Sequence, residues 1–118
     1  MGDIVEMRAP HAGTLCDSTT SISLFDRDHR LVRNFEFRMA SGCAEVPWNI
    51  VLRTAMTTRC RCILIDEYAA DGRAKADRAS ILRTRRLVRN FRMLDLRLCD
   101  HVVRSADSCF SFRAAGLL

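Results

Sequence analysis

Arginine is the residue type in this chain whose number and spacing could do chemistry. The 118 residues contain eighteen arginines and a single lysine, Lys75. An arginine side chain presents a planar fork of donors that fits phosphate and carboxylate oxygens, which a lysine ammonium lacks. The composition therefore indicates recognition of an anion, although a GC-rich coding sequence would produce the same skew.

The positive charge is concentrated in one segment of the chain. Residues 76–104 hold eight arginines against three aspartates, and this excess equals the net charge of +5 of the whole chain. A local basic surface is the electrostatic footprint of a polyanion partner. We therefore predict that this segment contacts the phosphates of RNA or DNA, while no residue indicates base specificity. The predicted contact residues are Arg85, Arg86, Arg89, Arg92 and Arg97.

A second grouping, of cysteines and one histidine, has the residue types of a zinc site. Cys60-x-Cys62 and Cys99-x-His101 supply four thiolate and imidazole groups. The spacing does not fit, because paired zinc ligands are usually separated by two to four residues. Two small buried core residues explain Cys60 and Cys62 equally well. We therefore expect no metal and no other cofactor.

Signals for catalysis are weak throughout the sequence. Ile63–Glu67, with the sequence ILIDE, resembles a magnesium-binding strand that ends in acids, but no phosphate-cradling glycine loop accompanies it. An edge strand that enters a turn is the simpler interpretation. Cysteines and histidines are present, yet their spacing does not pair them as nucleophile and base. The protein is therefore more simply interpreted as a non-enzyme.

A repeated string raises the possibility of an internal duplication. LVRNF occurs at residues 31–35 and 87–91, inside the longer pattern R-x-x-R-L-V-R-N-F, and a C-x-x-V follows both copies. Self-similarity of this kind usually marks one structural unit that is used twice. The two candidate units are residues 27–46 and 83–102.

The elements that must position these residues are expected to be mostly helical. Ala74–Arg104 is predicted as a long amphipathic helix, with Leu87, Val88, Phe91 and Leu98 on its apolar side and the arginines opposite. Pro47 fits the first turn of another helix. Residues 60–66 are the best strand.

Residues 22–39 fit two structures. The spacing of their apolar residues suits a helix, and their alternation suits a hairpin with a turn at residues 26–29. The repeat slightly favours the helix, because its second copy is predicted to be helical. Residues 1–21 are expected to form a loosely ordered N-terminal arm.

The sequence also bears on the compartment. It contains six cysteines, but the N-terminus is not a secretory signal, because acids stand at positions 3 and 6 and no apolar region follows. No apolar run approaches the roughly 18 residues of a membrane span. We therefore expect a soluble, cytoplasmic protein with free thiols and no membrane partner.

These observations lead to one expected fold and three functional hypotheses. The fold is a small single α+β domain over residues 22–118, dominated by helices, with an all-α fold as the alternative. The first hypothesis is a basic regulatory or accessory protein that binds nucleic acid through the arginine-rich helix face. The second is a protein-interaction module that uses the amphipathic helix to bind a partner or a second copy of itself. The third is an open reading frame product without an evolved function.

Overall fold

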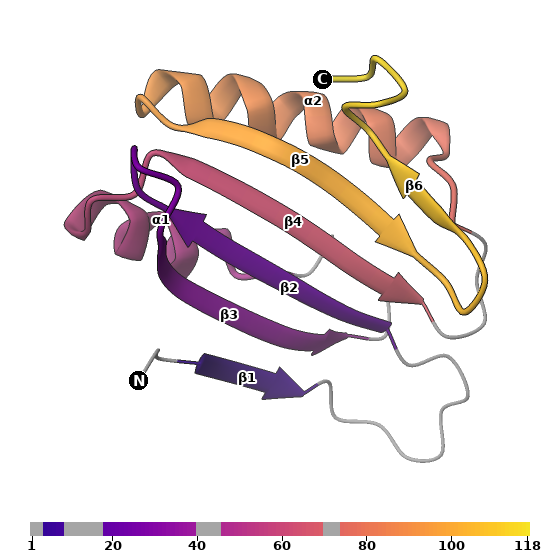
Figure 1. The fold of residues 1–118 in the computed structure, drawn as a ribbon, viewed down its shortest axis with the longest axis horizontal. Helices are drawn as coiled ribbons and strands as arrows, with labels where there is room; N and C mark the ends of the chain where they lie inside the picture. The colour runs from indigo at the N-terminus through magenta and orange to yellow at the C-terminus, as the bar shows by residue number, and fades with distance from the viewer. Residues whose placement is uncertain (1–3, 9–17, 40–45, 70–73) are drawn as a thin grey trace.

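The protein is built around one six-stranded mixed sheet with two helices. The computed structural model describes residues 4–8, 18–39, 46–69 and 74–118. In chain order the elements are β1 (Ile4–Arg8), β2 (Ser18–Phe25), β3 (Leu31–Met39), α1 (Trp48–Thr57), β4 (Cys62–Ala69), α2 (Arg78–Met93), β5 (Arg97–Arg104) and β6 (Cys109–Ser111). The strand order across the sheet is β1-β3-β2-β4-β5-β6 (Figure 1).

The expectation of a fold dominated by helices is wrong, and so is the all-α alternative. The six strands form the body of the molecule, and the described residues contain two helices. The strand expected over residues 60–66 is present as β4. It is a central strand and not an edge strand, because it pairs antiparallel with β2 and parallel with β5.

Residues 22–39 form the hairpin of β2 and β3, and the preference for a helix there was wrong. The Asp26 carboxylate accepts hydrogen bonds from the backbone N–H groups of Asp28 and Arg30, at 2.9 and 3.0 Å, which closes the turn. His29 has a φ of 62° at this reversal. Phe35 and Phe37 then alternate into the core, as the period of a strand requires.

The two LVRNF copies do not form the same structural unit. The first copy is the start of strand β3, and the second lies inside helix α2. The string suits both elements, because Leu and Phe four residues apart share one face of a helix and also one side of a strand. Tertiary pairing decides between the two, and the spacing of 56 residues carries no architectural repeat.

Helix α2 is shorter than the predicted Ala74–Arg104 helix. It begins after Asp77, whose side chain accepts a hydrogen bond from the Ser80 backbone N–H at 2.8 Å. This bond is the main reason that the pKa of Asp77 is lowered. After Met93 the chain turns through Asp95, which has a φ of 60°, and residues 97–104 continue as β5. The apolar pattern of this region therefore belongs to two elements.

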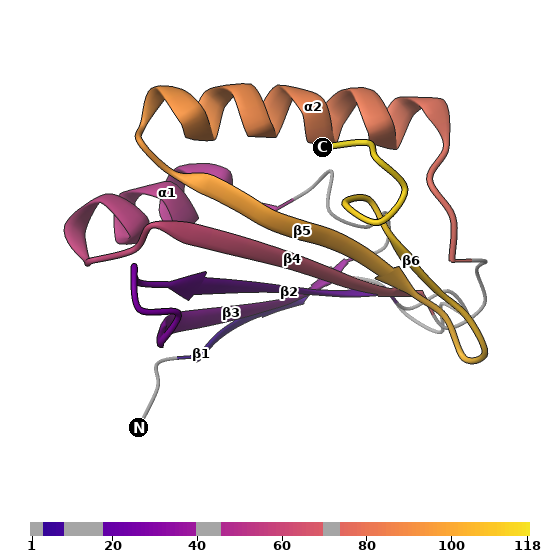
Figure 2. The same ribbon diagram turned by 45° about the horizontal axis from the view of Figure 1, so that its top comes forward.

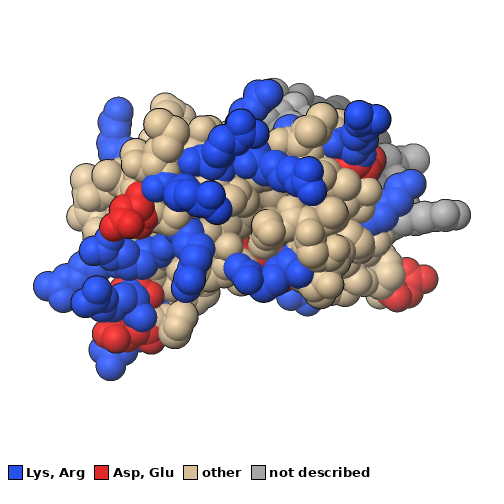
Figure 3. All heavy atoms as spheres, turned by 90° about the horizontal axis from the view of Figure 1, so that it is seen from above, with Lys and Arg blue, Asp and Glu red and all other residues tan. Residues whose placement is uncertain are grey.

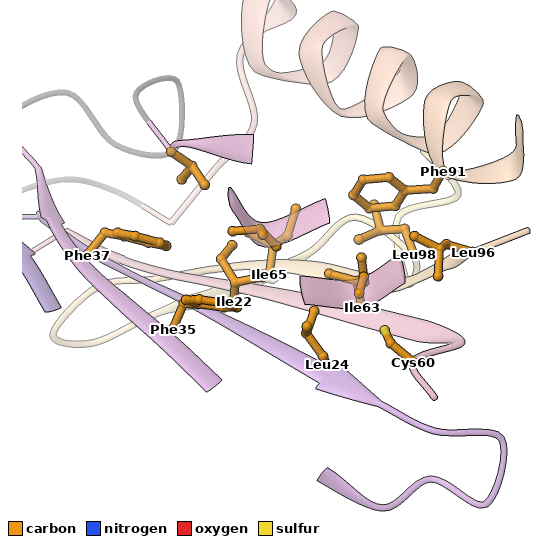
Figure 4. Packing of buried hydrophobic residues seen from close by; sticks show 13 residues of the cluster. Ile22, Leu24, Phe35, Phe37, Cys60, Ile63, Ile65, Phe91, Leu96 and Leu98 are labelled. Atoms are coloured by element: carbon orange, nitrogen blue, oxygen red, sulfur yellow. The ribbon is translucent and has the colours of Figure 1, made fainter. Parts of the chain in front are cut away.

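Both helices cover the same face of the sheet. Trp48 of α1 and Phe91 of α2 meet edge to face, with ring centroids 5.6 Å apart. The ribbon of Figure 2 shows α1 and α2 on this side of the sheet. Beneath them lies one hydrophobic cluster with contributions from β2, β3, β4 and β5 (Figure 4). Its innermost side chains include Ile22, Leu24, Phe35, Ile63 and Ile65.

The opposite face of the sheet is more polar. The Asn34 side-chain amide of β3 donates to the hydroxyl oxygens of Ser21 and Ser23 on β2, each at 2.9 Å. These cross-strand bonds satisfy polar groups on a face that the two helices leave uncovered. In the part of the chain that the structure describes, no helix is both long and apolar enough to cross a membrane.

Two residues of α2 that are two positions apart allow a test of how the helix is rotated about its own axis on the sheet. Phe91 is fully buried, whereas Met93 is 83% exposed. Replacing Phe91 with Ala is expected to lower the free energy of unfolding by about 3–5 kcal/mol, because it empties a close-packed site. Met93→Ala is the matched control and should change it by less than about 0.5 kcal/mol. If urea unfolding gave an equal loss of unfolding free energy for the two variants, α2 would have to be rotated differently on the sheet.

Candidate functional site

The outer face of α2 carries a row of arginines, and the helix itself contains no acid. The sixteen residues of the helix include six arginines and no acid. All six side chains are exposed, and among the described residues none of them forms an ion pair. Arg85, Arg89 and Arg92 follow one another at i, i+4 and i+7, so they share one side of the helix. We refer to these three residues as the arginine stripe.

The stripe leads to a cleft at the end of the sheet where β2 ends and where β4 and β5 begin. This cleft, the end cleft, has a volume of about 580 Å³. Its basic side chains come from the β2–β3 turn, the start of β4, the end of α2, the start of β5 and the C-terminal segment. They are Arg27, Arg61, Arg92, Arg97 and Arg113. Figure 3 shows basic side chains spread over the face that carries α2, with a group mixed with acidic ones at the left.

The structure separates the five arginines that were predicted as one helix face. Arg85, Arg86, Arg89 and Arg92 lie on α2, whereas Arg97 is the first residue of β5. Arg92 and Arg97 are nevertheless brought together, because both line the end cleft. Arg85, Arg86 and Arg89 do not line it and remain on the exposed side of the helix.

Two aspartates in the cleft wall are engaged by neighbouring groups. Asp26 accepts two backbone N–H groups of its own turn, and the hydrogen bond from Arg30 is the main cause that lowers its pKa. Asp95 forms an ion pair with Arg61 at 2.9 Å. Five arginines against two aspartates leave an excess of positive charge, so the cleft favours an anionic ligand.

Arg113 is held in place by the edge of the sheet. Its Nε donates to the Cys99 carbonyl oxygen at 2.6 Å, and one terminal nitrogen donates to the Leu98 carbonyl oxygen at 3.3 Å. The backbone N–H of Arg113 also donates to the Asp100 carboxylate at 3.0 Å. A guanidinium that is fixed in this way loses little conformational entropy when it binds a ligand.

The cysteine and histidine grouping does not form a metal site. Cys62 and Cys99 are joined by a disulfide between the neighbouring strands β4 and β5, with their Cα atoms 5.8 Å apart. The expectation of free thiols is therefore wrong for this pair. Cys60 is a buried free thiol whose pKa is raised by burial. Within the described ranges no cluster of three or more His, Cys, Asp or Glu side chains could hold a metal ion.

His101 belongs to a buried polar cluster that links α2, β4 and β5. The ring is fully buried, its Nδ1 lies 2.8 Å from the Thr84 hydroxyl, and its Nε2 is hydrogen-bonded to the Glu67 carboxylate. Phe112 stacks on the ring with centroids 4.3 Å apart. The arrangement has the residue types of a nucleophile–base–acid triad. Thr84 is only 1% exposed, however, so a substrate has no access to its hydroxyl and the cluster acts as a structural link.

Comparison with known proteins gives the family. The model of the RadC-like JAB domain matches residues 3–117, which is nearly the whole chain. The chain belongs to the RadC family.

One curated protein is similar to this chain over most of its length. This UPF0758 protein from Psychromonas ingrahamii (strain DSM 17664 / CCUG 51855 / 37) is 29% identical over 94 residues, which is 79% of this chain. The chain spans about 42% of the length of that relative.

Several cleft residues of the RadC domain were missed by the sequence prediction. Arg27, Arg61 and Arg113 come from three distant segments and join Arg92 and Arg97 only through the sheet. The charge excess of residues 76–104 pointed to one wall of the cleft. Nothing local marks the other walls, because each contributes only a single arginine or a short turn.

The Cys62–Cys99 disulfide is expected to stabilise the folded domain. It closes a loop with a sequence separation of 37, which corresponds to a loss of up to about 4 kcal/mol in the free energy of unfolding on reduction. Urea unfolding with and without dithiothreitol measures this loss. The Cys62→Ser/Cys99→Ser variant should not respond to dithiothreitol, whereas Cys109→Ser, at an exposed free cysteine, should respond like the wild type. Identical wild-type unfolding under both conditions would contradict the cross-link.

The link between Thr84 and His101 gives a second stability prediction. Thr84→Val keeps the shape of the side chain but leaves a buried ring nitrogen of His101 without its partner. The free energy of unfolding should fall by about 1–3 kcal/mol. Thr84→Ser retains the hydroxyl and should lower the free energy of unfolding by less than Thr84→Val does. If valine were tolerated better than serine in chemical unfolding, the hydrogen bond would not contribute.

Proposed function

We propose that this RadC-like domain binds nucleic acid through the outer face of α2 and the adjoining start of β5. The contacts to the phosphates would come from Arg85, Arg86, Arg89, Arg92 and Arg97. The RadC family is linked to DNA repair, which is compatible with a nucleic acid partner. The proposal thereby keeps the residues predicted from the sequence and changes the surface that presents them.

The observation that carries this proposal is the unfavourable charge arrangement of α2. Arg85 and Arg89 are four residues apart, and Arg89 and Arg92 three apart, and like charges at these spacings cost about 0.2–0.5 kcal/mol per pair. Arg78 adds a positive charge in the first turn, where the helix dipole disfavours cations. No acid within the helix offsets these costs. A polyanion partner offsets them and releases counterions when it binds.

The positions of the apolar side chains favour this proposal over helix pairing. The apolar side of α2 is already packed against the sheet, since Phe91 is fully buried and Leu87 and Val88 contact the core cluster. It is therefore not free to bind another helix. Leu82 and Met93 are exposed, at 57% and 83%, but they lie among arginines on the outer side. That mixture suits an acidic partner better than an apolar one.

Nucleic acid binding is tested by removing two members of the arginine stripe. The Arg85→Ala/Arg89→Ala variant should bind labelled DNA and RNA more weakly at low salt. Two lost phosphate contacts should reduce the slope of log K against log salt by about 2. Its melting temperature should stay the same or rise, because like-charge repulsion is removed.

The matched control replaces two exposed arginines away from this face. Arg53 lies on α1 and Arg38 on β3, and both side chains are exposed. Arg38→Ala/Arg53→Ala changes the net charge by the same amount as the stripe variant. If both double variants lose the same affinity and the same salt slope, only net charge matters and the α2 site is wrong. Absence of wild-type binding at low salt would also remove the proposal.

A further inference from the structure

The end cleft combines a basic rim with an apolar floor. Leu96 and Leu98 are 7% and 3% exposed, and together with Val88 and Leu118 they form the apolar part of its lining. A volume of about 580 Å³ is within the range of small-ligand sites, which are mostly apolar with a few convergent polar groups. The cleft therefore suits a ligand with a flat, weakly polar body and an anionic group at one end.

The end cleft is lined by five arginines and two aspartates, and neither aspartate forms an ion pair with Arg92, Arg97 or Arg113. The Oδ1 atom of Asp26 accepts two backbone N–H groups of its own turn, and Asp95 is paired with Arg61. Among the described residues, Arg27, Arg92 and Arg97 form no ion pair. Arg113, already fixed through the Cys99 and Leu98 carbonyls, lines the same space. Guanidinium groups that line one cleft in this way suit the several oxygens of one phosphate.

The number of guanidinium groups distinguishes two kinds of phosphate. An internal phosphodiester carries one negative charge, for which a single arginine suffices. A terminal phosphomonoester carries a charge of about −1.5 to −2 near pH 7, and it has three acceptor oxygens. Arg92, Arg97 and Arg113 in one cleft provide more positive charge than one diester needs, so the cleft fits the terminal group better.

From this arrangement we propose that the end cleft binds the terminal nucleotide of a nucleic acid strand. The phosphomonoester would lie against Arg92, Arg97 and Arg113, and the base would lie over Leu96 and Leu98. The proposal rests on the proposed function, because the arginine stripe would guide the strand toward the cleft. Arg92 belongs to both surfaces, so the two sites are continuous.

The decisive experiment compares single strands of one sequence that carry a 5′-phosphate, a 3′-phosphate or hydroxyl groups at both ends. Either the 5′-phosphate strand or the 3′-phosphate strand should bind the wild type about tenfold more tightly than the strand with hydroxyl groups at both ends. This factor is expected for charge-assisted hydrogen bonds to an ionised group. Arg97→Ala should lower this ratio of affinities, phosphorylated strand to hydroxyl strand, to about one. Arg85→Ala/Arg89→Ala should weaken the binding of all three strands and keep the ratio. Arg53→Ala is the control and should change neither quantity.

The outcomes separate the two proposals. Equal wild-type affinity for the three strands would overturn the end cleft as a terminal-phosphate site and leave nucleic acid binding through α2 intact. If no strand binds, the proposed function fails, and calorimetric titration with adenosine 5′-monophosphate then tests the cleft by itself. Binding of the mononucleotide that Arg97→Ala removes would support the cleft, and absence of binding would overturn it.

The melting temperature of Arg97→Ala shows whether the variant is folded. Arg97→Lys should restore only part of the affinity ratio, because the planar fork of donors is lost.

Discussion

The packing of α2 on β4 and β5 is the interaction on which the rest of the structure depends. Phe91 fills the space between this helix, α1 and the sheet, while Thr84 is hydrogen-bonded to His101 on β5. These two positions are seven residues apart, about two helical turns, so they fix the rotation of the helix at two levels. Once that rotation is fixed, the six arginines of α2 have only the outer side available to them. The basic face is therefore a consequence of the core.

The amphipathic pattern of α2 could be read from the sequence, but its end could not. Leu87, Val88 and Phe91 recur at helical spacing, and the pattern continues through Leu94, Leu98 and Val102. The chain leaves the helix because Leu98 pairs with Ile63 of β4 and His101 pairs with Ile65. Those partners lie more than thirty residues earlier in the chain, and a short apolar window fits a strand or a helix equally well. The local cue was Asp95, since aspartate tolerates the left-handed conformation better than most residues do.

The same reasoning explains why LVRNF folds in two ways. In β3 the string lies beside β2, and the buried Phe35 faces Ile22 across the ladder. In α2 its Phe is the buried anchor of the helix, and Leu87 packs on the same side. Intrinsic propensity differs between these states by less than the burial of one aromatic side chain contributes. The end cleft follows this pattern too. The charge excess drew attention to Arg92 and Arg97, which line the cleft, whereas the positions of Arg27, Arg61 and Arg113 there depend on the sheet topology.

The helix dipole affects the arginines of α2 unequally, and this bears on how the face and the cleft are related. A cation in the first turn, such as Arg78, is destabilised, whereas one in the last turn, such as Arg92, is stabilised. Arg92 therefore lowers the stability of the fold less than the arginines nearer the start of the helix. It is also the arginine of α2 that lines the end cleft. Folding stability alone would account for a basic residue at the last turn. It does not account for Arg78 or for the close spacing of Arg85 and Arg89, and these are the positions that the proposed polyanion partner would stabilise most.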